Sequence, residues 1–108
     1  MYERSRNIIE CHIAGFTYYS GLDVINELQL GTSVTLAYEP DNPYDPNAVA
    51  IYYKNTKIGY IPQNKNCHIS NLLYFGFNNL IDARINCRNT EVHPENQFRV
   101  VVKLKDNR

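Results

Sequence analysis

The sequence predicts a mainly β fold, a small six-stranded barrel of the SH3-like or OB-like type with one or two short helices. Apolar and polar residues alternate in six short segments, and Gly, Pro, Asn and Asp recur between these segments. The 108 residues leave room for a single core, and closing a sheet removes its exposed edges. We expect residues 1–7 to be a flexible N-terminal segment and residues 8–104 to form the barrel.

The first half of the chain offers three strands and one short helix. Residues 8–13 alternate as a half-buried strand does. Residues 21–28 follow as a short helix that Gly31 ends. Strands are expected again at residues 34–38 and 48–54. The side chains that should point inward are Ile9, Cys11, Ile13, Leu22, Ile25, Leu28, Val34, Leu36 and Tyr38.

The second half offers three more strands and a clearer helix. A hairpin turn at residues 55–56 leads to a strand at residues 57–61. Residues 64–76 form a helix in which Gly76 supplies the C-cap. The strongest alternation is found at residues 81–88 and 98–104. Inward side chains here are Ile69, Leu72, Leu73, Ile81, Ala83, Ile85, Cys87, Phe98, Val100, Val102 and Leu104.

The charges balance overall, with 11 basic and 11 acidic residues, but their distribution along the chain is uneven. No acidic residue falls between Asp45 and Asp82, whereas Lys54, Lys57 and Lys65 do. One interpretation is a local positive face on a neutral molecule. The other is scattered, solvated charge.

Several classes of protein are disfavoured. No apolar run is long enough to span a membrane, and no signal-peptide pattern is present. The three cysteines show no pairing pattern, so we expect free thiols in a reducing, cytoplasmic compartment. No zinc-ligand spacing, phosphate-binding glycine loop or hydrolase motif occurs. We therefore expect a non-catalytic protein without a metal or cofactor.

The segment DNPYDPNA, residues 41–48, is the most informative stretch of the chain. Pro43 and Pro46 fix the backbone at two points of one loop, and Tyr44 lies between them. Such a loop can present an aromatic ring to a ligand at a small entropic cost. The alternative is a decorated hairpin turn in which Asp45 merely caps the loop.

Three segments together resemble the HIRAN domain: AGFTYYSG (14–21), LQLGTSVTLAYEPDNPYDPNAVAIYY (28–53) and KIGYIP (57–62). The similarity covers roughly residues 8–104, which would make the protein a stand-alone HIRAN-like barrel. The resemblance implies a six-stranded OB-like or SH3-like barrel. It also implies binding of single-stranded DNA, including a free 3′ end, in replication-fork and DNA-repair proteins.

The resemblance carries over to single residues. Tyr18 matches an aromatic residue that stacks on a base near the strand end. Asn42, Tyr44 and Asp45 match the loop that holds the terminal nucleotide, where a carboxylate accepts a hydrogen bond from the 3′ hydroxyl. The DNA-binding residues that this implies are Thr17, Tyr18, Tyr19, Asn42, Tyr44, Asp45, Tyr60 and Lys65.

One position departs from the family pattern. Thr17 stands where DNA-binding members carry a basic residue, so a phosphate contact is lost.

Two alternative functions remain open. The tyrosine-rich surface could form a homo-oligomer or dock a partner protein without binding DNA. Asp41 and Asp45 could instead hold a divalent cation in a small metal-dependent hydrolase that acts on nucleic acid.

Overall fold

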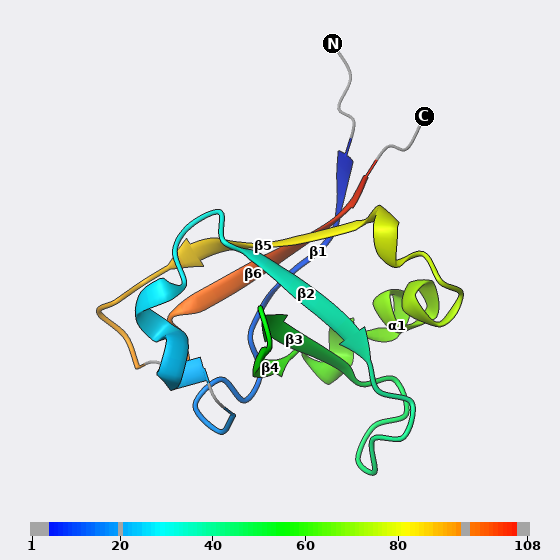
Figure 1. Cartoon of the computed structure of the whole chain (residues 1–108), viewed down its shortest axis with the longest axis horizontal. Helices are drawn as coiled ribbons and strands as arrows, with labels where there is room; N and C mark the ends of the chain where they lie inside the picture. Colours follow the sequence, from blue (N-terminus) through cyan, green and yellow to red (C-terminus); the bar gives the residue numbers. More distant parts are fainter. Residues whose placement is uncertain (1–4, 20, 94–95, 106–108) are drawn as a thin grey trace.

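A computed structural model describes residues 5–19, 21–93 and 96–105. Six antiparallel strands, the number predicted, form one curled sheet, in which their order is β1-β6-β5-β2-β3-β4 (Figure 1). The strands are β1 (Ser5–His12), β2 (Ser33–Tyr38), β3 (Val49–Tyr53), β4 (Thr56–Tyr60), β5 (Ile81–Arg88) and β6 (Phe98–Lys105). β1 thus begins three residues earlier than Ile8, where the alternation begins.

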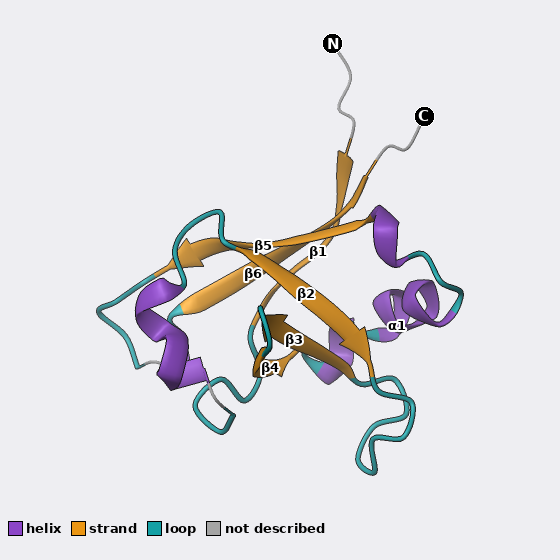
Figure 2. Cartoon of the chain, in the orientation of Figure 1, coloured by secondary structure: helices purple, strands orange, loops and turns teal. Residues whose placement is uncertain are grey.

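Short helices close the ends of the curled sheet (Figure 2). The 3-10 helix η1 spans Gly21–Glu27, and the α-helix α1 spans Cys67–Tyr74 and packs against β2. Two single 3-10 turns, η2 (Gln63–Lys65) and η3 (Asn78–Leu80), flank α1. Gly76 caps α1 as predicted, with φ of 84° and its N–H donating to the Leu73 carbonyl at 3.1 Å.

The core lies inside the curl and is filled by the alternating side chains of the strands. The rings of Phe16 and Phe98, both fully buried, lie 5.0 Å apart within it. The inward side chains predicted for the strands are buried or half-buried with one exception, Cys87. The buried members of the core cluster are Cys11, Ile13, Phe16, Leu28, Val34, Leu36, Val49, Ile51, Ile58, Ile61, Ile69, Leu73, Ala83, Ile85, Phe98, Val100 and Val102.

Three local predictions were wrong. Cys87 is exposed because a β-bulge between Ile85 and Cys87 reverses the side to which later residues of β5 point. Leu22 is also exposed, and the ring of Phe16 instead lies against the backbone of η1 at Gly21. The hairpin turn between β3 and β4 falls one residue earlier than predicted, at residues 54–55.

The sheet closes where the chain beyond β1 meets β4. The N–H of Ala14 donates to the Tyr60 carbonyl at 2.8 Å, and the Tyr60 N–H donates to the Ala14 carbonyl at 2.9 Å. Gly59 permits this approach, because a Cβ there would lie 2.4 Å from Ile13 Cγ2 and 2.6 Å from the Ala14 carbonyl oxygen. Closure therefore depends on a missing side chain.

Gly59→Ala should consequently destabilise the fold by about 2–3 kcal/mol, the cost of forcing a methyl group into packed surroundings. Gly31→Ala is the matched control. Gly31 also has a positive φ, of 85°, but no atom lies within 4 Å of its Cβ position. The control should lose only about 1 kcal/mol through backbone strain. Urea denaturation measures both, and equal losses would show that steric closure at Gly59 is unimportant.

Candidate nucleic-acid interface

An aromatic corner follows the closing contact directly. The N–H groups of Tyr18 and Tyr19 donate to the Gly15 carbonyl at 2.9 and 3.2 Å, which makes a tight turn. Phe16 anchors this turn in the core, whereas the side chain of Tyr18 is 83% exposed. Tyr19 lies edge-on between Tyr18 and Tyr60, with ring centroids 5.0 and 5.2 Å away. The corner therefore presents aromatic surface from a fixed backbone.

The loop between β2 and β3 is held by its own side chains and projects beyond the sheet (Figure 1). Asn42 Oδ1 accepts the N–H groups of Tyr44 and Asp45 at 2.9 and 3.1 Å. Asp45 Oδ1 accepts the Asn47 N–H at 2.9 Å, and Asp45 Oδ2 accepts Asn66 Nδ2 at 2.7 Å. Tyr44 is 91% exposed. The loop is thus pre-organised with its tyrosine ring in solvent.

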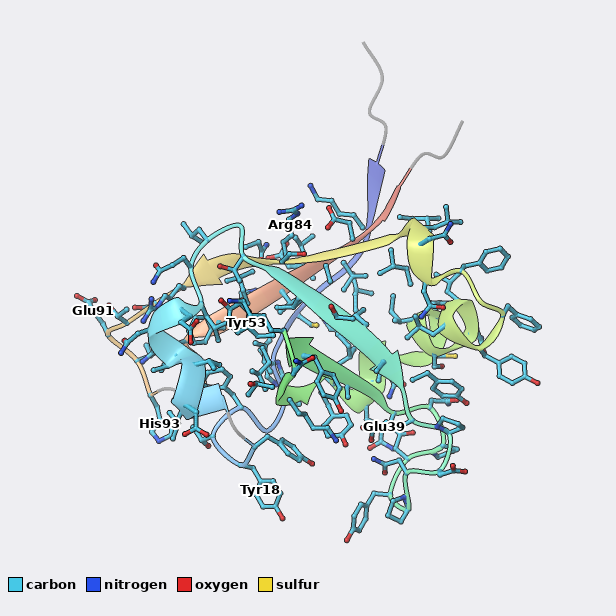
Figure 3. All side chains as sticks on the ribbon, viewed as in Figure 1. Tyr18, Glu39, Tyr53, Arg84, Glu91 and His93 are labelled. Carbon is cyan, nitrogen blue, oxygen red and sulfur yellow. The ribbon has the colours of Figure 1, made fainter. Side chains whose placement is uncertain are left out.

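An open groove of about 510 Å³ separates the corner from the loop. Four of the predicted site residues line it, namely Tyr19, Asn42, Tyr44 and Tyr60. Tyr18 is not part of the lining, but its ring contacts that of the groove-lining Tyr19. Figure 3 shows the labelled Tyr18 and Glu39 on the same lower side of the barrel. The complete lining is Tyr19, Tyr38, Glu39, Pro40, Asp41, Asn42, Pro43, Tyr44 and Tyr60.

Besides Tyr18, three predicted site residues lie outside the groove lining. Asp45 accepts hydrogen bonds from Asn47 and Asn66 and so stabilises the loop, which is the role that the alternative interpretation, a capped hairpin turn, gave it. Lys65 donates to the Glu10 carbonyl at 3.2 Å, beside β1. Thr17 is half-buried within the turn of the corner. Whether these residues contact DNA stays a prediction.

A polar cluster that the sequence did not reveal borders the groove. Lys57 Nζ contacts Glu39 Oε2 at 2.8 Å and Tyr60 Oη at 3.0 Å. The Tyr60 hydroxyl donates to Glu39 Oε1 at 2.6 Å, and Asn42 Nδ2 donates to the same oxygen at 3.3 Å. Glu39 and Lys57 are 18 residues apart, and a bulge between Ile51 and Tyr52 shifts the intervening register. No periodicity in the sequence signals this pairing.

The hydrogen bonds fix the charges of the cluster. Burial raises the pKa of Glu39, but hydrogen bonds from Lys57, Tyr60 and Asn42 outweigh it and leave that pKa below its ordinary value. The hydrogen bond to Glu39 raises the pKa of Lys57 against the effect of burial. Burial, together with the hydrogen bond to Glu39, raises the pKa of Tyr60. At neutral pH the cluster holds a carboxylate, an ammonium group and a neutral phenol.

The remaining chemistry of the described residues is sparse. No three His, Cys, Asp or Glu side chains among them gather closely enough to hold a metal ion. Cys11 is a core residue, and burial raises the pKa of its thiol to about 11. The three cysteines are free thiols. Within the described ranges, no helix has the length and apolar character needed to cross a membrane.

Comparison with known proteins identifies the family. Residues 7–105 match the HIRAN domain. The chain belongs to the HIRAN family. Two curated relatives of this HIRAN domain are the helicase-like transcription factors of Oryctolagus cuniculus and Homo sapiens, which are 34% and 32% identical over 80 residues. Each alignment covers 63% of this chain but only 8% and 7% of the relative, so the matched region is less than a tenth of either protein.

Solved structures share the fold. A protein from Lactobacillus plantarum superimposes with a TM-score of 0.80 at 18% identity, covering 95% of this chain and 97% of the other. The HIRAN domain of human HLTF gives a TM-score of 0.62 at 21% identity, covering 94% and 81%. The prediction of a HIRAN barrel is therefore confirmed.

The lowered pKa of Glu39 predicts how stability varies with pH. Its contact with Lys57 stabilises the fold fully above the ordinary carboxyl pKa of 4.5, and this contribution is lost as the pH falls through the lower folded-state pKa. Glu39→Gln should therefore be less stable than the wild type at about pH 7, with the gap narrowing at about pH 3. Urea denaturation measures the gap, and exposed Glu91→Gln is the control. An equal gap at both pH values would contradict the prediction.

Proposed function

We propose that this HIRAN domain binds single-stranded DNA without catalysis and receives a free 3′ end in the groove between the aromatic corner and the loop. One observation carries the proposal. Tyr18 and Tyr44, from segments 26 residues apart in the chain (44 − 18), are both strongly exposed. Tyr44 lines the groove, and the ring of Tyr18 contacts the groove-lining Tyr19. Family membership supports nucleic acid as the ligand, and the replication or repair setting of the family is part of the proposal.

Aromatic rings suit this ligand because every base has a flat face on which a ring can stack. The corner and the loop both hold their rings on hydrogen-bonded backbone. Little conformational entropy is then lost when a flexible strand binds. Stacking of this kind tolerates different base sequences, so we expect weak sequence preference.

The charges of the groove favour a hydroxyl over a phosphate at the strand end. Among the described lining residues, Glu39 and Asp41 are acidic and none is basic. A terminal phosphate would bring further negative charge close to these carboxylates. A 3′ hydroxyl carries no charge and can donate a hydrogen bond to a carboxylate or to the Asn42 amide.

Tyr44→Ala should weaken binding of a 3′-hydroxyl oligonucleotide by about 1–3 kcal/mol, the value of one lost base stack. Because Tyr44 is exposed, its truncation should leave the unfolding temperature unchanged. Fluorescence anisotropy at low salt measures the affinity, and an oligonucleotide with a 3′ phosphate should bind more weakly. Phe75→Ala, which removes an exposed ring outside the groove lining, is the control.

Two outcomes would contradict parts of this proposal. Equal binding of hydroxyl and phosphate ends would exclude end capture while leaving strand binding possible. An absence of binding at low salt would exclude the DNA function itself.

Self-association is the second candidate function, and an exposed aromatic patch favours it. The patch consists of Tyr74, Phe75 and Phe77 at the end of α1. The rings of Tyr74 and Phe75 lie 5.0 Å apart, and Tyr74 also contacts Tyr38 at 6.4 Å between centroids. Exposed aromatic clusters of this kind are common at protein interfaces.

If the patch mediates self-association, Phe75→Ser should convert an oligomer to a monomer, because it removes an aromatic anchor of the contact. Light scattering coupled to size exclusion measures the mass. Tyr44→Ala is the matched control and should leave the mass unchanged, because Tyr44 is exposed but is not part of the patch. A wild-type protein that is monomeric at high concentration would rule out this function.

A further inference from the structure

We propose that Lys57 is the phosphate-binding cation of the groove and that Glu39 masks it in the unbound protein. This inference rests on the proposed function, because it assumes that a DNA strand enters the groove. It assigns a charge-bearing contact to a residue outside the predicted site, on β4 rather than on the corner or the loop.

The position of Lys57 is the first argument. Three groove-lining residues contact its ammonium group, namely Tyr19, Glu39 and Tyr60. The nitrogen lies 5.0 Å from the ring centroid of Tyr60, 5.5 Å from that of Tyr19 and 6.0 Å from that of Tyr52. These rings hold the cation by cation–π attraction at the surface where bases are proposed to stack.

The local charge balance is the second argument. The aromatic corner, residues 15–19, contains no charged residue. The loop from Glu39 to Ala48 contributes Glu39, Asp41 and Asp45 and no basic residue. A DNA strand in this groove would therefore meet carboxylates on one side. Lys57 is the basic side chain that the described contacts link to both the corner and the loop.

The donor capacity and exposure of Lys57 are the third argument. An ammonium group carries three donor protons, and its contacts with Glu39 and Tyr60 engage two of them. The side chains of Lys57 and Glu39 remain 27% and 26% exposed. A phosphate oxygen can therefore approach without the cluster being dismantled. Lys57 also keeps its charge, since the hydrogen bond to Glu39 raises its pKa.

Masking by Glu39 explains how the groove could stay selective. The Glu39 carboxylate neutralises Lys57 at 2.8 Å, so an incoming phosphate must share the ammonium with it. Glu39 keeps its hydrogen bonds from Tyr60 and Asn42 while it does so. Electrostatic attraction alone is then weak, and a strand stays bound only when its bases also stack. Glu39 is thus proposed as a specificity-determining residue that lowers the affinity for DNA.

The experiment compares two variants and two matched controls on a labelled oligothymidine of about eight nucleotides. Lys57→Met removes the proposed cation, and Lys54→Met removes a charge from the turn of the same hairpin, where Lys54 lies over Tyr53. Glu39→Gln removes the mask at nearly constant size. Glu91→Gln removes a carboxylate at the far end of the molecule, where Figure 3 labels it well apart from Glu39. Affinity is measured over a series of salt concentrations.

Lys57→Met should bind about tenfold more weakly than Lys54→Met, the effect of one charge-assisted contact. Its salt dependence should be shallower by about 0.7 in the logarithmic slope, as expected for one lost phosphate contact with a single strand. Glu39→Gln should bind several-fold more tightly than Glu91→Gln. Thermal unfolding shows that each variant is folded at the assay temperature.

The two variants respond oppositely only if Glu39 masks Lys57. If the pair merely braces the groove, both substitutions weaken binding and neither changes the salt slope, which overturns the inference. It is equally overturned if Lys57→Met matches Lys54→Met, or if Glu39→Gln binds no better than Glu91→Gln. Should Lys57→Met not fold, the Glu39→Gln comparison decides. A wild-type protein that binds no oligonucleotide refutes the proposed function instead.

Discussion

The pair of backbone hydrogen bonds between Ala14 and Tyr60 is the contact on which the candidate interface depends. It closes the curled sheet, and it also fixes two parts of the groove at once. The aromatic corner begins directly after Ala14, and Tyr60 itself lines the groove and contacts Tyr19. Gly59 makes this approach possible. The absence of a side chain at Gly59 thus links the closure of the barrel to the geometry of the candidate site.

The other side of the groove is formed by the loop between β2 and β3, which is held by side-chain hydrogen bonds rather than by sheet pairing. Asn42 and Asp45 accept backbone N–H groups of the loop, and Asn66, just before α1, ties Asp45 to the body of the domain. Asn66 is buried, so this link is shielded from water. The aromatic corner and the loop therefore face each other across the groove, and both have a backbone with little conformational freedom. Rigid walls suit a ligand that is itself flexible.

The strands could be predicted well because a strand with one buried face has alternating apolar and polar residues, and this alternation is visible in the sequence. The sequence also predicted the Gly76 cap, and the resemblance located the corner and the loop. The prediction failed where the pairing register of two strands decides to which side of the sheet a residue points. A single extra residue in β5 turned Cys87 outward, and a bulge in the β3–β4 pair accompanies the contact of Lys57 with Glu39. A one-residue slip reverses every later side chain, and neither bulge has a signature in the pattern.

The neutral net charge of the chain takes on a specific meaning in this geometry. Glu39 offsets the positive charge of Lys57, and Asp41 lines the same groove, so the interior of a DNA strand, with a phosphate on each side of every base, meets repulsion from Asp41 there. A strand terminus has one phosphate fewer beside its last base and meets less repulsion. Carboxylates that weaken binding along a strand therefore weaken it least at an end. Under the proposed function, low overall affinity and preference for a terminus have the same electrostatic origin, and aromatic stacking provides most of the attraction.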